Sequence, residues 1–113
     1  MAASIINLES GMPKTEAALM RLKLELATLR RCGVNSVKII HGYGSTGPGG
    51  AIRLATRNYL REQLQMGRIR AYCPGEQFGP FEPNGRKTIQ IMPAFRHDPD
   101  WGRQNDGITI VII

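Results

Sequence analysis

One segment combines residue types that could bind a phosphate. The apolar run Val37–Ile40 ends at His41, and a glycine-rich loop follows before a helical pattern resumes near Ala51. Glycine lets backbone N–H groups turn towards a ligand, and the start of a helix adds unpaired N–H donors and a partial positive charge. A strand, a glycine-rich loop and a helix start, in this order, predict an anion-binding site that suits a phosphate.

A nucleotide is one source of that phosphate. The spacing Gly42-x-Gly44-x-x-Gly47 matches the dinucleotide-binding fingerprint. The fingerprint also requires an acidic residue at the end of a second strand, about 20 residues further on. Glu62 stands at that distance but inside a helical pattern, and no Gly-Lys-Ser/Thr follows the glycines to make a Walker A loop. A small-nucleotide-binding module is therefore the weakest of the alternatives.

The charge balance favours the phosphates of a nucleic acid. The formal net charge is +6, the pI is about 9.9, and eleven of the fifteen basic residues are arginine, whose forked guanidinium suits phosphate oxygens. Arg53, Arg57 and Arg61 recur every fourth residue, so they form one cationic stripe on a helix. Arg68 and Arg70 are expected to share one face of the next strand. The stripe predicts a polyanion-binding face, although an ordinary solvated helix face has the same spacing.

Hydrophobic spacing predicts the elements that position these residues. The predicted strands cover residues 5–8, 37–40, 69–72 and 106–113, and the predicted helices cover residues 14–31 and 50–66. Gly33 and Gly67 are natural stops for the two helices. Strands that alternate with helices predict an α/β layer fold with a parallel pair of strands at its centre.

A long insertion at about 73–105 precedes the last strand of the single domain that we expect over residues 1–113. Residues 84–92 fit a short helix inside it, although Ile89 and Ile91 also fit a strand. Five of the seven aromatic residues fall between Tyr72 and Trp101. We interpret them as a small core that holds the insertion down; a stacking platform for single strands is the alternative.

The remaining polar clusters point to no firm cofactor. His97 lies among carboxylates in the segment Arg96–Asp100, where we favour a solvated loop over a metal site. Cys32 and Cys73 belong to no Cys-x-x-Cys motif, so we expect two buried or half-buried thiols. No apolar run approaches the ~18 residues of a membrane span, and the first residues lack the features of a signal peptide. These features predict a cytoplasmic protein that does not contact membranes.

Three segments resemble the Smr domain, the small MutS-related module. The segment Gly11–Ala17 is similar to the opening of the family's first helix. Val37–Gly44, followed by Gly47, resembles its central strand and His-Gly-x-Gly loop, and Asp106–Val111 resembles its closing Gly-x-Thr-x-Val strand. The resemblance implies a two-layer β-α-β-α-β-β sandwich with a mixed four-stranded sheet, similar to the C-terminal domain of the third bacterial translation initiation factor.

The resemblance also implies a function. Smr domains bind nucleic acid, and several act as endonucleases on DNA or RNA. Together with the charge pattern, it predicts a nucleic-acid-binding domain that contacts the phosphate backbone. The predicted contact residues are His41, Gly42, Tyr43, Gly44, Gly47, Arg53, Arg57 and Arg61.

The first strand departs from the family pattern in a way that bears on catalysis. The family's strand usually ends Leu-Asp-x-His-Gly, whereas Asn7 stands here in place of the aspartate, and Glu9 or Ser10 in place of the histidine. An amide cannot act as a general base or an anionic metal ligand, but Glu9 could do either. The alternative function is thus a divergent endonuclease with His41 and Glu9 as catalytic residues, which would imply Mg²⁺ or Mn²⁺. The sequence sets neither the type of nucleic acid nor the oligomeric state.

Overall fold

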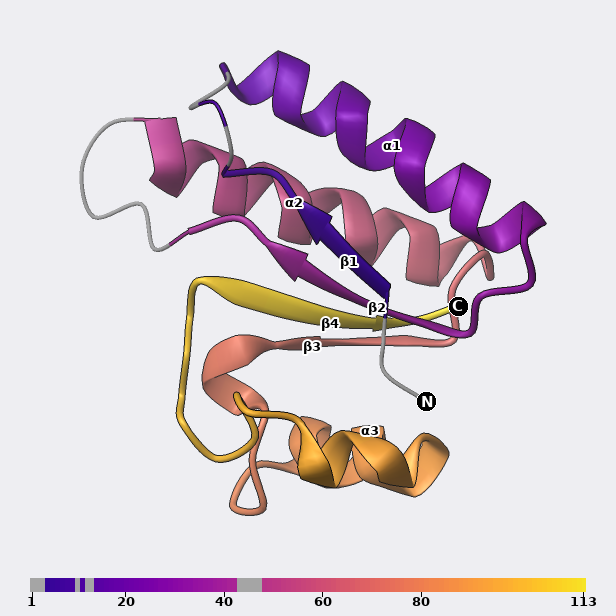
Figure 1. The fold of residues 1–113 in the computed structure, drawn as a ribbon, viewed down its shortest axis with the longest axis vertical. Helices are drawn as coiled ribbons and strands as arrows, with labels where there is room; N and C mark the ends of the chain where they lie inside the picture. The colour runs from indigo at the N-terminus through magenta and orange to yellow at the C-terminus, as the bar shows by residue number, and fades with distance from the viewer. Residues whose placement is uncertain (1–3, 10, 12–13, 43–47) are drawn as a thin grey trace.

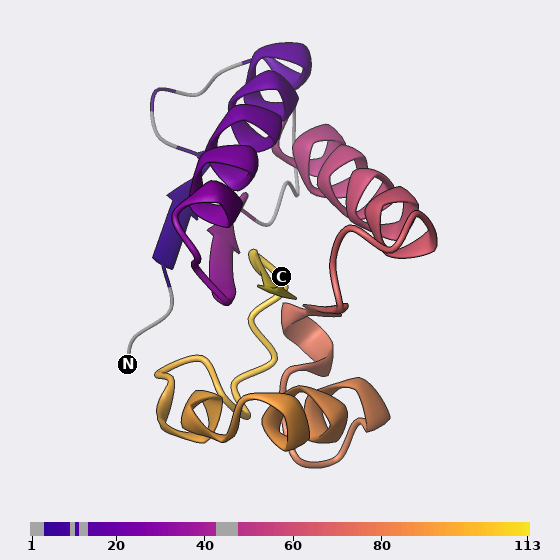
Figure 2. The same cartoon turned by 90° about the vertical axis from the view of Figure 1, so that its right-hand side faces the viewer.

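A four-stranded sheet lies between two layers of helices (Figures 1 and 2). The computed structural model describes residues 4–9, 11, 14–42 and 48–113. The strands β1 (Ser4–Asn7), β2 (Ser36–Ile40), β3 (Ala71–Pro74) and β4 (Ile108–Ile112) lie in the order β1-β2-β4-β3. Helices α1 (Thr15–Arg31) and α2 (Pro48–Gln65) cover one face, and α3 (Pro83–Ile91) covers the other.

The sheet is mixed, as predicted. Strands β1 and β2 pair in parallel, whereas β4 pairs antiparallel with both β2 and β3. The expectation of a parallel pair at the centre was wrong, because β4 enters between β2 and β3 and makes the central pair antiparallel. The physical reason lies in the connection from β3 to β4. It crosses the opposite face of the sheet instead of returning through a helix on the α1–α2 face, as a parallel crossover would require.

Both long helices were predicted to within two residues. Helix α1 buries Ala18, Leu22 and Leu26, which are spaced four residues apart and therefore share one face. Gly33 and Gly67 follow the two helices with φ angles of 78° and 71°, the left-handed conformation that ends a helix. The predicted two-layer sandwich of sheet and helices is therefore present, and the insertion adds a third layer to it.

Alternating side chains of the sheet build two cores. Val37, Ile39 and Val111 pack towards α1 and α2. Ile108, Ile110 and Ile112 point to the other face, where they meet the insertion. Strands β2 and β4 are covered on both faces, which explains their nearly continuous apolar sequences.

Aromatic residues hold the insertion against the sheet. It contains two 3₁₀ helices, η1 (Gly75–Gln77) and η2 (Pro93–His97), in addition to α3, which confirms the predicted helix. The ring of Phe78 packs edge-on against Phe95 and Trp101, with centroid distances of 5.7 and 5.1 Å. The prediction that aromatic residues form a small core that holds the insertion down is confirmed for these three residues. It does not hold for Tyr72, which packs on the α1–α2 face, or for Phe81, which is 91% exposed.

A buried lysine fastens the insertion to the centre of the sheet. Lys38 of β2 places its Nζ 2.7 Å from Asp98 Oδ1 and 2.6 Å from Asp100 Oδ2. Asn105 donates to Asp100 and accepts from the backbone N–H of Gly107, each at 3.0 Å. Burial alone would lower the Lys38 pKa, but the hydrogen bonds to the two carboxylates outweigh burial and raise it. A charged lysine therefore links β2, the insertion and the start of β4.

Three expectations need correction. The carboxylates of the segment 96–100 belong to this lysine cluster rather than to a solvated loop or a metal site; His97 itself is exposed. Cys32 is exposed, whereas Cys73 is buried as expected. Strand β3 begins two residues later than predicted, so Arg68 and Arg70 lie in the preceding turn instead of on a strand face. In the described ranges, no helix has the length and apolar character that crossing a bilayer requires.

Candidate nucleic-acid interface

The loop after β2 is anchored to the beginning of β4. The backbone N–H groups of His41 and Gly42 both donate to the carbonyl oxygen of Gly107, each at 3.0 Å. Gly42 has a φ angle of 81°, in the left-handed region that favours glycine. The Gly42 N–H is therefore engaged within the protein, so a phosphate would have to use other donors of the loop or of the α2 N-terminus.

The His41 side chain is buried and neutral. It is only 1% exposed, and its Nδ1–H donates to the Gly42 carbonyl oxygen at 2.9 Å. Since a carbonyl can only accept, Nε2 carries the lone pair and accepts from the Thr109 hydroxyl at 2.9 Å. Burial lowers the His41 pKa below its ordinary value of 6.5, and the charges of Arg57 and Arg53 lower it further. Both ring nitrogens thus have partners inside the protein.

Arg57 connects α2 to the His41 environment. Its Nη1 and Nη2 each donate to one oxygen of Glu76 at 2.8 Å, in a forked ion pair. Its Nε lies 3.4 Å from the Thr109 hydroxyl, and Nη2 lies 3.4 Å from the Asp106 carbonyl oxygen. Partial burial alone would raise the Glu76 pKa, but hydrogen bonds from Arg57 and the Glu76 backbone N–H outweigh burial and lower it. Glu76 is therefore ionised at neutral pH and holds Arg57 inside the protein.

The predicted arginine stripe has a paired part and an exposed end. Arg53 Nη1 lies 3.0 Å from Asp106 Oδ2, in a partly exposed ion pair. Arg61 is exposed and donates to the amide oxygen of Asn58 at 2.7 Å. Within the described ranges, Arg61 makes no salt bridge. The stripe therefore offers its freest positive charge at Arg61, far from the glycine loop, while Arg53 and Arg57 are neutralised by carboxylates.

Glu9, the second predicted catalytic residue, lies close to Gly42. A Cβ placed on Gly42 would overlap Glu9 Oε2, so this carboxylate sits directly against the residue that follows His41. The Glu9 backbone N–H donates to Asn7 Oδ1 at 2.9 Å, so Asn7 supports the turn after β1. The other predicted loop residues, Tyr43, Gly44 and Gly47, lie outside the described residues, as does Ser10.

The carboxylates near His41 do not fit a divalent-metal site. Asp106 pairs with Arg53 and Glu76 with Arg57, whereas Glu9 forms no salt bridge with any residue that the structure describes. Nowhere in the described ranges do three His, Cys, Asp or Glu side chains gather as metal ligands would. A Mg²⁺ or Mn²⁺ ion needs several oxygen ligands, so we derive no chemical step through one.

Sequence reasoning missed the three residues that organise this region. Glu76 and Asp106 bind the stripe arginines, and Thr109 bonds His41. The sequence contains a weak indication of these three residues. Glu76 immediately follows a predicted strand, and Asp106 and Thr109 belong to the Asp-Gly-x-Thr segment of the last strand. Acidic residues at strand ends are natural counter-ions for arginines on a helix that packs over the sheet.

Comparisons with known proteins agree on one family. The Smr domain family model matches residues 10–79, more than half of the chain. The structure is similar to the crystal structure of the Smr domain of Thermus thermophilus MutS2, with a TM-score of 0.60 and 20% sequence identity. The alignment covers 97% of this chain and 96% of that chain, so the two share a fold over nearly their whole length. No curated protein matches the chain.

Replacing His41 by glutamine should reduce the free energy of unfolding by about 1–3 kcal/mol at neutral pH, because buried hydrogen-bonding groups lose a partner. The pKa of His41 is lowered in the folded state, so below pH 6.5 the unfolded chain binds more protons than the folded chain. The stabilisation by His41 is thus complete above pH 6.5 and is lost as the pH falls towards the lowered pKa. Urea unfolding of both proteins across this range should show the penalty of His41→Gln shrinking towards acidic pH.

His97→Gln is the matched control, because His97 is the other histidine and is exposed. It should leave both the stability and its pH dependence unchanged. A His41→Gln penalty that stays constant across the same pH range would contradict the buried, neutral state of His41.

Gly42→Ala should destabilise the protein more than Gly11→Ala. Both glycines have a positive φ, 81° and 79°, which costs another residue about 1–2 kcal/mol. A Cβ at Gly42 meets the Glu9 carboxylate, whereas nothing lies within 4 Å of one at Gly11. Chemical denaturation should therefore give an excess penalty for Gly42→Ala that Glu9→Ala relieves in the double variant. Equal penalties at the two glycines would rule out the contact between Glu9 and Gly42.

Proposed function

Because the chain belongs to the Smr domain family, whose members generally bind nucleic acid, we propose that it binds the phosphate backbone of DNA or RNA along the exposed flank of α2. The observation that carries this proposal is the exposed positive end of the arginine stripe. Arg61 makes no salt bridge within the described ranges, and Arg68 and Arg70 follow α2 with exposed side chains. The formal net charge of +6 adds long-range attraction to a polyanion.

The stripe arginines have two different roles in this proposal. Arg61 contacts phosphate directly, because its guanidinium is exposed and its partner Asn58 is neutral. Arg57 is a positioning residue, because Glu76 occupies its fork and Thr109 links it to His41. Arg53 lies between the two cases, since its ion pair with Asp106 is partly exposed.

The glycine loop would extend the same surface. It lies between His41 and the N-terminus of α2, whose first N–H groups have no partner within the helix. We propose that the loop residues 43–47 and this helix start meet a phosphate, as the sequence pattern predicts. In this account, buried His41 holds the base of the loop through Gly42 and Thr109 instead of touching the ligand.

A divergent endonuclease is the second candidate function, and one contact favours it. The Glu9 carboxylate lies against Gly42, next to the predicted catalytic partner His41. Two observations argue for binding without cleavage. Both His41 nitrogens have protein partners, and the nearby carboxylates do not fit a metal site. A general base needs a free lone pair within reach of its substrate.

Arg61→Gln should reduce the slope of log affinity against log salt by about one, the contribution of one phosphate contact. The double variant Arg57→Gln/Glu76→Gln should leave the slope unchanged, because it removes two charges that already neutralise each other. Fluorescence anisotropy with a labelled oligonucleotide at several salt concentrations measures the slope. The control is Arg103→Gln, which removes an exposed arginine of the insertion and should have no effect on the slope. A slope lowered by Arg57→Gln/Glu76→Gln but not by Arg61→Gln would overturn the assignment of roles.

End-labelled single-stranded and double-stranded DNA and RNA should remain uncut by the protein, with or without Mg²⁺, while still being bound. The reason is that neither nitrogen of His41 can take a proton from a nucleophile in this arrangement. Denaturing gels over a time course provide the measurement. Cleavage that disappears in both His41→Gln and Glu9→Gln would instead establish the endonuclease.

A further inference from the structure

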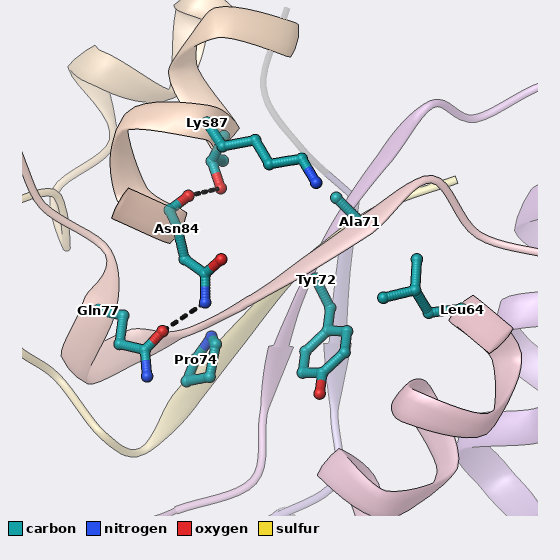
Figure 3. A pocket seen from close by; sticks show the side chains of 8 residues that line it. Leu64, Ala71, Tyr72, Pro74, Gln77, Asn84 and Lys87 are labelled. Atoms are coloured by element: carbon teal, nitrogen blue, oxygen red, sulfur yellow. Dashed lines mark hydrogen bonds between the residues drawn. The ribbon is translucent and has the colours of Figure 1, made fainter. Parts of the chain in front are cut away.

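A second concave site lies away from His41, at the outer edge of β3. It is a cavity of about 250 Å³ between the end of α2 and the insertion (Figure 3). Leu64 contributes from α2, Tyr72 and Pro74 from β3, and Asn84 and Lys87 from α3. None of these residues takes part in the hydrogen bonds of His41 or Arg57 described above, so the cavity is separate from the region around His41.

The cavity has an apolar wall and a polar wall. Leu64, Pro74 and the ring of Tyr72 form the apolar side (Figure 3). On the side away from Leu64, next to Pro74, Asn84 Nδ2 donates to Gln77 Oε1 at 2.5 Å (Figure 3). This bond leaves Asn84 Oδ1 as an acceptor and Gln77 Nε2 as a donor, and neither bonds to any other described residue. Such a cavity suits a flat ring that packs on one face and forms hydrogen bonds along its edge.

The charges around the cavity favour an anionic ligand. Lys87 is exposed, and its ammonium group reaches across the cavity towards Ala71 (Figure 3). No acidic residue lines the cavity. Arg70 directly precedes Ala71 in the chain, and Arg61 lies three residues before Leu64 on α2; both arginines are exposed and adjoin residues that line the cavity.

The volume limits the ligand to a single ring system. Pockets that enclose a drug-sized molecule measure about 300–1,000 Å³, so this cavity is slightly smaller than that range. A base fits such a volume if its sugar and phosphate stay outside, where the ammonium group of Lys87 is available to the phosphate. Asparagine and glutamine are the side chains that pair with base edges in many complexes.

We propose that this cavity holds one unpaired base of a single-stranded nucleic acid. The inference rests on the proposed function, because the strand would reach the cavity along the exposed flank of α2. Arg53 and Leu64 are eleven residues apart on this helix, about 16 Å along its axis. One strand can therefore follow α2 from the glycine loop and place a base beside Tyr72. The cavity makes the domain selective for unpaired nucleotides.

The test compares two single-stranded probes of equal length and charge, one with bases and one with abasic sugars throughout, and a duplex of the same length. The double variant Gln77→Ala/Asn84→Ala should weaken binding of the base-bearing strand by about 5- to 100-fold. It should leave the abasic strand, the duplex and the salt slope unchanged. Circular dichroism checks that the variant folds.

Lys87→Ala should weaken both single strands and reduce their salt slope by about one, because it removes a phosphate contact. Arg103→Gln is again the control: it removes an exposed arginine of the insertion that does not line the cavity, and it should change neither quantity.

Equal affinity for the base-bearing and abasic strands, with the Arg61→Gln effect intact, would overturn the base pocket and leave the proposed function standing. Failure of every probe to bind would overturn both the base pocket and the proposed function.

An extended peptide could instead add to the open edge of β3. In that case, adding such a peptide would shift the NMR signals of β3, and Gln77→Ala/Asn84→Ala would not change the affinity for nucleic acid. These two results together would assign the cavity to a protein strand and contradict the proposal.

Discussion

The forked ion pair between Arg57 and Glu76 is the interaction on which the site depends. It joins the middle of α2 to the segment after β3, and the same guanidinium reaches Thr109 of β4, which in turn bonds His41 at the end of β2. Arg57 thus connects α2, the 3₁₀ helix η1 and β4, and it reaches the end of β2 through Thr109. A partly buried pair of this kind contributes little net stability when intact, but losing one partner leaves the other charge without its counter-ion. Its value here is geometric, because it fixes the base of the glycine loop.

Much of the fold could be predicted because local patterns determine it. The spacing of Ala18, Leu22 and Leu26 fixed the buried face of α1, and the β-branched runs marked β2 and β4. The antiparallel centre of the sheet was not predictable in this way, because it depends on which face the long insertion covers. The clearest missed signal was Lys38. A lysine within an apolar strand needs a buried counter-ion, and Asp98 and Asp100 supply it from 60 and 62 residues away.

The candidate site was predicted less completely than the fold. The resemblance to the Smr family suggested Glu9 as a partner of His41, and helical spacing placed three arginines on one helix face. Spacing could not distinguish a paired arginine from a free one. That distinction depends on Glu76 and Asp106, which lie 19 and 53 residues from their partners in the chain. The three arginines of the stripe could not be told apart in the sequence, because a helical repeat shows on which side of the helix a side chain lies but not which residues it contacts. The likeness to the Smr family supplied the functional class that spacing alone left open.

The central claim is that Arg57 organises the interface while Arg61 meets the nucleic acid. The side-chain Nε–H signals of the arginines in ¹⁵N-edited NMR spectra test it most directly, with Arg57→Lys and Arg61→Lys identifying the two signals. The Arg57 signal should exchange slowly with solvent and keep its position when a single-stranded oligonucleotide is added, whereas the Arg61 signal should shift. A shift of the Arg57 signal with Arg61 unmoved would contradict the account.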